Sequence, residues 1–254
     1  MGYIVLKHFT LKKGNFSLTI EEFKAGEGAL IAICGPNGSG KTSFLSGLAG
    51  LLPYQGSYQI NSREFASISQ RERTRLFAYL PQETRLHLPF DVFYVVLTGR
   101  YALVKGTDYS RVDYEKTEKV LETFDLTSYE KRLFNTLSGG EKKRVLLART
   151  FNKEAKVLLL DEPFSELDIK HQLNTIYFLK NYAKDRKAVV LVVLHELQLA
   201  ASFFDEVVLL SKGRMVFKGP PKNLSEETLS KTFKVKTKLV NLEKKEPFTF
   251  YVLR

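Results

Sequence analysis

What the sequence lacks already narrows the class of protein to which it can belong. Cys34 is the only cysteine among 254 residues, so no internal disulfide can form, and a reducing, cytoplasmic setting is expected. The longest aliphatic run, Ala188 to Leu194, is far shorter than the ~20 residues that span a bilayer. Glycine and proline are not in excess and no low-complexity tract is present, which argues against a disordered protein.

The composition that is present describes a globular, basic chain. Hydrophobic residues make up 44% of the sequence, which is enough to bury a substantial core. Lys and Arg outnumber Asp and Glu by 39 to 28, so the formal net charge is +11. This excess suits an acidic partner such as nucleic acid, anionic lipid or a polyphosphate, and it is equally typical of a lysine-rich surface. The charge alone does not choose between these readings.

Hydrophobic patterning predicts an α/β fold with a mostly parallel sheet. Short, continuous apolar runs alternate with helical stretches, as expected for parallel strands that are covered on both faces. The predicted strands of this core are Leu30 to Cys34, Val157 to Asp161, Ala188 to His195 and Glu206 to Ser211. We expect an antiparallel β part at the N-terminus.

Two further segments break the alternation. Residues 83–150 are mostly helical and charged, which predicts a helical subdomain inserted into a cassette of residues 1–221. Its clearest helix runs from Ser110 to Leu126, with an apolar stripe of Val120, Leu121 and Phe124. Residues 222–254 form a C-terminal extension, which we predict to hold a short helix and a β-hairpin that turns at residues 243–247.

Residues 35–42, "GPNGSGKT", match the phosphate-loop pattern G-x-x-x-x-G-K-[ST] and follow a predicted strand. In this context the backbone N–H groups converge on phosphate oxygens at the positive end of the next helix. Lys41 is predicted to reach the β and γ phosphates, and the Thr42 hydroxyl to ligate Mg²⁺. The full set predicted to bind ATP is Gly35, Pro36, Asn37, Gly38, Ser39, Gly40, Lys41, Thr42 and Ser43.

Polar residues that follow other predicted strands supply the rest of an ATPase. Asp161 and Glu162 end a buried strand, so Asp161 is expected to hold Mg²⁺ and Glu162 to act as general base on the attacking water. His195 ends another strand, where it can orient the water or the glutamate. Gln82 follows a strand-like piece and can contact the metal ion or the water.

A second anion seat lies at residues 138–141, "SGGE". Ser138 and Glu141 have the spacing of a helix capping box, which by itself would only start a helix. Gly139 and Gly140 additionally let a phosphate approach the amides of the helix N-terminus. Because the first seat is already complete, we predict that the two seats meet across a homodimer, with each ATP between two chains.

Together these residues resemble the ATP-binding subunits of ABC transporters over residues 1–240. The resemblance rests on six motifs in order: "GPNGSGKT" (Walker A), "LPQE" (Q-loop), "LSGGE" (signature), "VLLLDEP" (Walker B), "SELD" (D-loop) and "LHEL" (switch histidine). It implies that Asp168 of the D-loop lies at the dimer interface. It further implies an aromatic residue that stacks on adenine, for which Phe9 and Phe16 are the alternatives.

The resemblance also implies partners and a location. The segment after Gln82, which includes Leu86, His87, Phe90 and Phe93, would receive the coupling helix of an integral membrane permease. A substrate-binding protein would act with it indirectly, and no nucleic acid is expected. The chain would then be peripheral on the cytoplasmic face of the inner membrane.

A finer resemblance is to the ATPases that serve importers of iron–siderophore complexes, haem and cobalamin. It rests on "VVLTGRY", "SELDIKHQL" and the stretch from Leu194 to Pro221. Small departures from that family are Glu166 where alanine is common, Phe164 where threonine is common, and Lys142 with Lys143 after the signature. The alternatives are an ABC exporter ATPase, a soluble ABC ATPase acting on nucleic acid or ribosomes, and a non-hydrolysing scaffold.

Overall fold

A ten-stranded sheet runs through the computed structural model, which describes residues 3–82, 89–104, 106–240 and 249–253. One half of this sheet is parallel, in the order β6 (Phe77–Leu80), β7 (Val157–Asp161), β8 (Val189–Val193), β3 (Leu30–Cys34) and β9 (Glu206–Ser211). The other half continues through β10 (Arg214–Gly219), β2 (Phe16–Ala25), β1 (Ile4–Lys13), β4 (Tyr54–Ile60) and β5 (Arg63–Glu64). There β1 pairs antiparallel with both β2 and β4.

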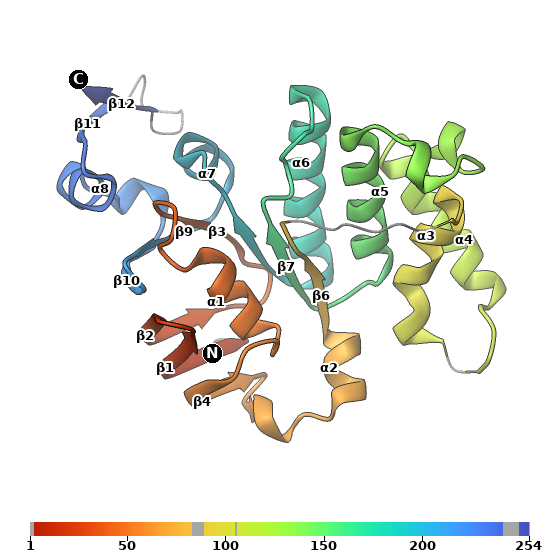
Figure 1. The fold of residues 1–254 in the computed structure, drawn as a ribbon, viewed down its shortest axis with the longest axis horizontal. Coiled ribbons are helices and arrows are strands. Elements are labelled where there is room, and N and C mark those ends of the chain that lie inside the picture. Colours follow the sequence, from red (N-terminus) through yellow and green to blue (C-terminus); the bar gives the residue numbers. More distant parts are fainter. Residues whose placement is uncertain (1–2, 83–88, 105, 241–248, 254) are drawn as a thin grey trace.

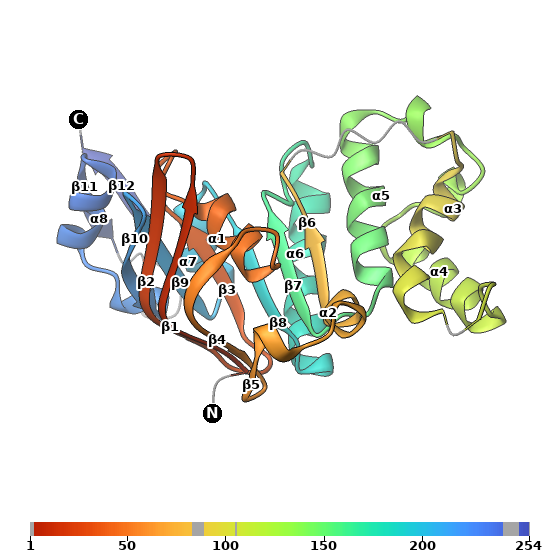
Figure 2. The ribbon, with the colours of Figure 1, turned by 60° about the horizontal axis from the view of Figure 1, so that its bottom comes forward.

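Burial on both faces explains the continuous apolar sequence of the parallel strands. Along β7, Leu158 and Leu160 face a core shared with α5 (Gly139–Asn152), α6 (Ile169–Arg186) and α7 (Leu197–Phe203). Val157 and Leu159 face a second core, which α1 (Lys41–Leu48) shares with the antiparallel strands. Figure 2 shows α1 between the antiparallel strands and the parallel half of the sheet.

Helices inserted between β6 and β7 stand apart from the sheet on the right of Figure 1. They are α3 (Val92–Leu97), η2 (Thr98–Leu103), α4 (Arg111–Thr123), η3 (Thr127–Tyr129), η4 (Phe134–Thr136) and α5. The predicted helix from Ser110 to Leu126 is α4, which Ser110 caps and which ends three residues early. The remaining short elements of the core are η1 (Phe65–Ser67) and α2 (Gln70–Leu76).

The C-terminal residues add a helix and a strand pair beside β9 and β10. After η5 (Pro221–Asn223), α8 (Glu226–Phe233) buries Leu229 in the core that contains α6 and α7. The strands β11 (Lys236–Val240) and β12 (Thr249–Leu253) then pair antiparallel. The turn predicted between them lies outside the described residues. The predicted α/β class, with its mostly parallel sheet, antiparallel N-terminal part and inserted helices, is confirmed.

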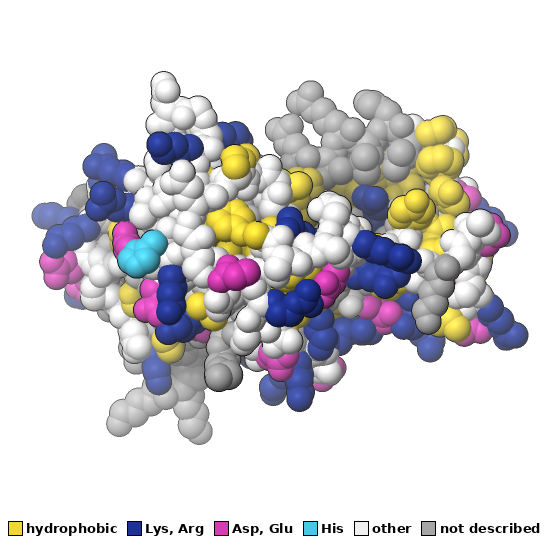
Figure 3. Space-filling model, turned by 90° about the horizontal axis from the view of Figure 1, so that it is seen from below, with side chains coloured by type: hydrophobic (Ala, Val, Ile, Leu, Met, Phe, Trp, Pro, Cys, Tyr) yellow, Lys and Arg dark blue, Asp and Glu magenta, His cyan; other side chains and the backbone are white. Residues whose placement is uncertain are grey.

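The surface charge is dispersed on the face shown in Figure 3, where basic and acidic side chains lie among one another. Many of the described acidic groups there and elsewhere pair with a neighbouring cation, as Glu72 does with Arg63 and Glu115 with Arg111. Exposed pairs of this kind contribute little to stability, because solvent screens them. On this face, the basic side chains that contribute to the net charge of +11 do not form a single basic stripe.

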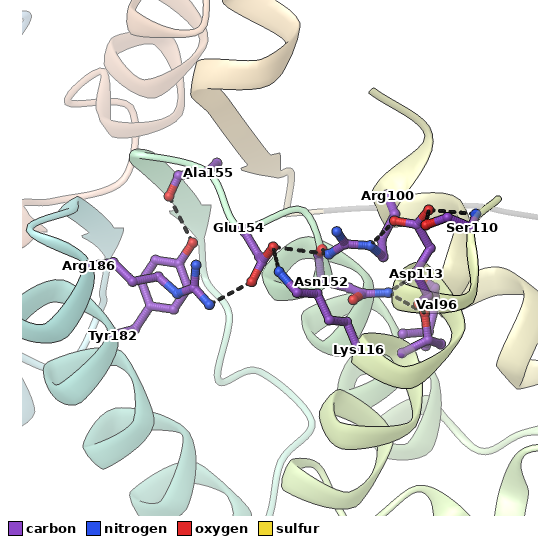
Figure 4. A network of polar contacts seen from close by, with 11 residues as sticks. Val96, Arg100, Ser110, Asp113, Lys116, Asn152, Glu154, Ala155, Tyr182 and Arg186 are labelled. Carbon is purple, nitrogen blue, oxygen red and sulfur yellow. Dashed lines mark hydrogen bonds and ion pairs between the residues drawn. The ribbon is translucent and has the colours of Figure 1, made fainter. Parts of the chain in front are cut away.

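A network of ion pairs joins the inserted helices to one another and to α6 (Figure 4). Arg100 of η2 lies 2.5 Å from Asp113 of α4 and 3.2 Å from Glu154, which follows α5. Glu154 also pairs with Lys116 of α4 at 2.5 Å and with Arg186 of α6 at 2.7 Å. Burial alone would raise the pKa of Glu154, but the hydrogen bonds from Lys116 and Arg186 outweigh it and lower the pKa to about 2.

Candidate functional site: a nucleotide cleft at the carboxyl ends of the strands

The phosphate loop joins β3 to α1, as the sequence predicts. Gly40 caps α1 with a φ of +106°, a backbone conformation that strongly favours glycine. A Cβ at this position would lie 2.8 Å from the ring of Phe16, so the loop and the β1–β2 hairpin pack too closely for a side chain. The close packing brings the N-terminal hairpin to the edge of the loop.

Lys41 bridges the loop from the first residue of α1. Its ammonium group donates hydrogen bonds to the carbonyl oxygens of Gly35 at 2.9 Å and Pro36 at 3.3 Å. Burial lowers the pKa of Lys41, and the nearby charge of Glu162 partly restores it. The lysine is therefore held next to the amides that would surround a phosphate, with the Glu162 and Asp161 carboxylates close by.

Asp161 ends β7 beneath the loop and is fully buried. Burial raises the pKa of its carboxyl group, and the Thr42 hydroxyl nearby lowers it only in part. Within the described part of the chain, neither carboxylate oxygen has a hydrogen bond of good geometry. An unpaired buried carboxylate beside a hydroxyl is costly unless a cation or proton satisfies it, so these two residues fit a divalent ion.

Glu162 and His195 meet at the mouth of the same cleft. The Nε2–H group of His195 donates to Glu162 Oε1 at 2.5 Å, the tautomer that an acceptor carboxylate requires. Glu162 has a φ of +49°, and its N–H group donates to the Val193 carbonyl at 3.3 Å, which ties its backbone to β8. His195 lies two residues beyond the end of β8 at Val193, so the strand ends earlier than the sequence predicts.

These groups line one open cleft of about 560 Å³. Its walls are residues 37–43 of the phosphate loop and α1, together with Gln82, Glu162 and His195. Gly35 and Pro36, which the sequence places in the ATP site, do not line the cleft but hold Lys41 through their carbonyl groups. The predicted residues of the first seat therefore converge on one place, although they come from four separate parts of the chain.

The structure separates the two phenylalanines proposed to contact adenine. Phe16 lines the cleft together with Lys13, a residue that the sequence reasoning missed. Phe9 is fully buried and stacks on Tyr54 with 5.2 Å between ring centroids, so it cannot reach a ligand. The Phe9 alternative is thus wrong, because strand β1 turns this side chain into the core. Lys13 lies close to Phe16 on the hairpin of β1 and β2, and this short spacing could have identified Lys13 as a residue of the cleft.

The second seat lies away from the cleft of its own chain. Ser138 caps α5 by accepting from the Glu141 N–H group at 3.4 Å, and the Glu141 carboxylate accepts from the Ser138 N–H group at 2.7 Å. The predicted capping box is therefore present. None of Ser138, Gly139, Gly140 and Glu141 lines the described nucleotide cleft.

Asp168 of the D-loop caps α6. It accepts from the His171 N–H group and from His171 Nδ1, both at 2.8 Å. These hydrogen bonds lower the pKa of the Asp168 carboxyl group, the backbone one contributing most. Within its own chain this residue therefore serves as a helix cap, and its predicted place at a dimer interface stays a prediction.

Two buried groups near the loop were not assigned any role from the sequence. Cys34 ends β3 directly before the phosphate loop, and burial raises the pKa of its thiol to about 12. Lys143 of α5 is only 7% exposed, and the charges near its ammonium group are those of Glu166, Glu162 and Asp161.

No helix among the described residues is long and apolar enough to cross a membrane.

A phosphate loop after the central strand β3, with an acidic pair at the end of β7 on the far side of β8, defines a P-loop ATPase. Comparison with known proteins refines this class. The family model described as ABC transporter matches residues 18–165, and the chain belongs to that family. It is an ATPase, as the order of its motifs predicts.

The relatives and solved structures agree with this membership. The Hemin import ATP-binding proteins HmuV of Chelativorans sp. (strain BNC1) and Rhizobium meliloti (strain 1021) are each 38% identical, the first over 85% of this chain and 84% of its own length, the second over 82% of both. A metal-chelate type ABC transporter solved in an inward-facing conformation has a TM-score of 0.84 at 26% identity, covering 100% of this chain and 98% of its own. A dimeric ATP-binding cassette bound to ADP and Pi shares the fold, with a TM-score of 0.75 at 23% identity, covering 87% of this chain and 100% of its own.

Proposed function

We propose that this chain is the ATP-hydrolysing subunit of an importer for haem or a related iron chelate. The observation that carries the ATPase part is the Glu162–His195 pair, which faces the phosphate loop across one cleft. The iron-chelate part is supported by the hemin importers among the relatives and by the metal-chelate transporter among the solved structures. Siderophore and cobalamin complexes stay open as cargo.

In the proposed mechanism the loop amides and Lys41 bind the phosphates of ATP. Thr42 and Asp161 would hold Mg²⁺, with Gln82 as a further contact at the edge of the cleft. The ion would neutralise charge on the β and γ phosphates. Lys41 would exchange its hydrogen bonds to the loop carbonyls for bonds to phosphate oxygens.

Glu162 would accept the proton of the attacking water. Its side chain is mostly buried and already holds the His195 ring through a hydrogen bond, which fixes both side chains before a nucleotide enters. His195 would keep that carboxylate directed at the water and face the γ-phosphate. A positioned base of this kind contributes about 10²- to 10⁴-fold to a rate.

Two chains would share each ATP. The first seat is complete within one chain, whereas Ser138, Gly139, Gly140 and Glu141 line no part of its cleft, so a second copy can bring them to the nucleotide. Asp168 would lie at that interface. Dimerisation would then depend on ATP, and loss of the γ-phosphate would release the pair.

A membrane permease would bind the inserted helices. Phe90, Tyr94 and Leu133 are 42%, 41% and 51% exposed and lie close together, since the Phe90 and Tyr94 rings are 4.8 Å apart and Leu133 is paired with Asp91. Phe93, also predicted here, is partly buried against the core instead. Leu86 and His87 lie outside the described residues. The chain would sit on the cytoplasmic face of the membrane, with a substrate-binding protein acting indirectly.

The alternatives are less well supported. An ABC exporter would use the same cleft, but the relatives reported above are import proteins by name. A soluble ATPase acting on nucleic acid would need a concentrated basic surface, and the face in Figure 3 mixes both signs of charge. A non-hydrolysing scaffold would have no use for the hydrogen-bonded Glu162–His195 pair.

The test is the variant Glu162→Gln. ATP turnover should fall by ~10²-fold or more, because the base is lost while the nucleotide contacts remain. In the presence of ATP without Mg²⁺, size-exclusion chromatography with light scattering should then record a dimer that is absent without ATP. Glu118→Gln, which removes an exposed carboxylate on α4, is the control and should leave turnover unchanged. Turnover of Glu162→Gln within tenfold of the parent protein would refute the base assignment.

A further inference from the structure

The Glu166 side chain lies directly on the glycines of the signature motif. A Cβ added at Gly139 would overlap the Glu166 carboxylate oxygen Oε2, and one added at Gly140 would lie 2.7 Å from the Glu166 carbonyl oxygen. Glu166 has a φ of +68°, an unfavourable conformation for a non-glycine residue that the loop between β7 and α6 nevertheless holds. Gly140 is thus needed within one chain to let the backbone of this loop approach α5, whereas at Gly139 the Glu166 carboxylate itself fills the space of a side chain.

The electrostatic field at this position favours a carboxylate. The N-terminus of the 14-residue helix α5 carries a partial positive charge, which attracts an anion. Glu166 is exposed and forms no ion pair or hydrogen bond with any other described residue, and the helix end provides a favourable field for its charge. Ser138 and Glu141 are already bonded to each other in the capping box and leave the space above the glycines to Glu166.

Lys143, one turn into the same helix, offers a second place for the carboxylate. The residue is only 7% exposed, and its ammonium group forms no hydrogen bond or ion pair with another described residue. Glu166 contributes the largest charge interaction on it, ahead of Glu162 and Asp161, and raises its pKa against the lowering effect of burial. Burial of most of the lysine side chain disfavours its charge, so a carboxylate that moved toward the ammonium group would be stabilised.

We propose that the Glu166 carboxylate occupies the signature glycines of the free chain and must be displaced toward Lys143 before the γ-phosphate of an ATP on a second chain can bind there. This inference rests on the shared nucleotide site proposed above. Both anions would use the same end of α5, so they cannot be there together. The negative charge of Glu166 therefore raises the ATP concentration at which two chains associate, and Lys143 limits that increase.

The experiment measures the ATP concentration that gives half-maximal dimer at fixed protein concentration, by light scattering, in the Glu162→Gln background. Adding Glu166→Gln removes the charge and keeps the shape, so this concentration should fall by about five- to tenfold, as expected for one repulsive contact between anions. Adding Glu118→Gln, which removes a charge elsewhere, should leave it unchanged. An unchanged or higher concentration for Glu166→Gln would overturn the proposal.

Lys143→Gln supplies the second variant. Without the ammonium group the displaced carboxylate has no counter-charge, so the half-maximal ATP concentration should rise by about threefold or more with Glu166 present. Combined with Glu166→Gln, the same change should have almost no effect, because the two side chains act on one step. Equal effects of Lys143→Gln in both backgrounds would contradict the coupling.

Failure of the wider proposal would look different. If no variant forms a dimer at any ATP concentration while a fluorescent ATP analogue still binds each one, the shared site itself is refuted, and this inference with it. If dimers form in all variants at the same ATP concentration, the shared site stands and only the role of Glu166 is refuted.

Discussion

At the scale of single residues, the two phenylalanines of the first hairpin share one face of the sheet and differ in their position along the hairpin. Phe9 points into an aromatic cluster with Tyr54 and Tyr58, whereas Phe16 reaches the edge of the nucleotide cleft and touches the phosphate loop. Both belong to the apolar pattern of β strands, so sequence alone left them as alternatives. Their different exposure depends on the place of β1 between β2 and β4, and the pairing with β4 joins segments that are far apart in the sequence.

Phe16→Ala should weaken ATP binding by about tenfold, since stacking of a base on an aromatic ring contributes ~1–3 kcal/mol. Isothermal titration of the Glu162→Gln protein with ATP provides the measurement. Phe16→Tyr, which keeps the ring, should bind ATP as the parent does. If the alanine variant bound ATP with unchanged affinity, the adenine would have to contact another wall of the cleft.

The positions of the proposed catalytic residues were predictable from the sequence for a local reason. Asp161, Glu162 and His195 all follow strands whose continuous apolar sequence makes their ends easy to locate, and parallel strands place their ends at one edge. The pair at 2.5 Å between Glu162 and His195 follows from the neighbouring positions of β7 and β8. By contrast, the contact of Glu166 with Gly139 depends on a loop with a positive φ, for which the sequence has no periodic signal.

At the scale of elements, the ion-pair network joins the inserted helices to α6. Arg100 and Glu154 are separated by 54 positions along the chain, yet their side chains are 3.2 Å apart. Glu154 directly precedes the segment that leads into β7, the strand that ends at Asp161. The elements were predicted from local pattern, whereas this connection between them could not be, because it joins distant residues of ordinary charged type.

Arg100→Ala should lower the free energy of unfolding by about 3 kcal/mol, because it leaves the buried Asp113 carboxylate without its main cation. Urea unfolding followed by circular dichroism measures this loss. Arg111→Ala removes an exposed arginine from the same helix region, where its pair with Glu115 is solvated, and should cost less than about 0.5 kcal/mol. Equal losses in the two variants would show that burial of the network carries no extra stability.

At the scale of the whole molecule, the nucleotide cleft and the signature helix belong to different regions of one chain. The cleft lies among the sheet and α1, whereas α5 stands with the inserted helices (Figures 1 and 2). The sequence predicted two phosphate seats but could not place them relative to each other. Only the three-dimensional arrangement shows that residues 138–141 do not line the nucleotide cleft of their own chain.

Ser138→Arg should prevent ATP-dependent dimerisation while leaving ATP binding to the single chain within about twofold, since Ser138 lies outside the cleft. In the Glu162→Gln background, light scattering with ATP should record only monomer, and a fluorescent ATP analogue should still bind. Glu118→Gln again serves as the control that dimerises normally. A Ser138→Arg dimer that formed at the usual ATP concentration would contradict the assignment of the second seat to a neighbouring chain.

The burial of Cys34 at the end of β3 has a practical consequence. With its pKa raised to about 12 and its side chain 1% exposed, the only thiol of the protein is hidden from alkylating reagents in the native state. A reagent can reach it only when the strand that carries the phosphate loop separates from its neighbours. The rate at which Cys34 is alkylated therefore measures how often the structure beneath the nucleotide opens. Spectroscopic labels that react quickly with cysteines introduced at the surface would leave Cys34 unmodified.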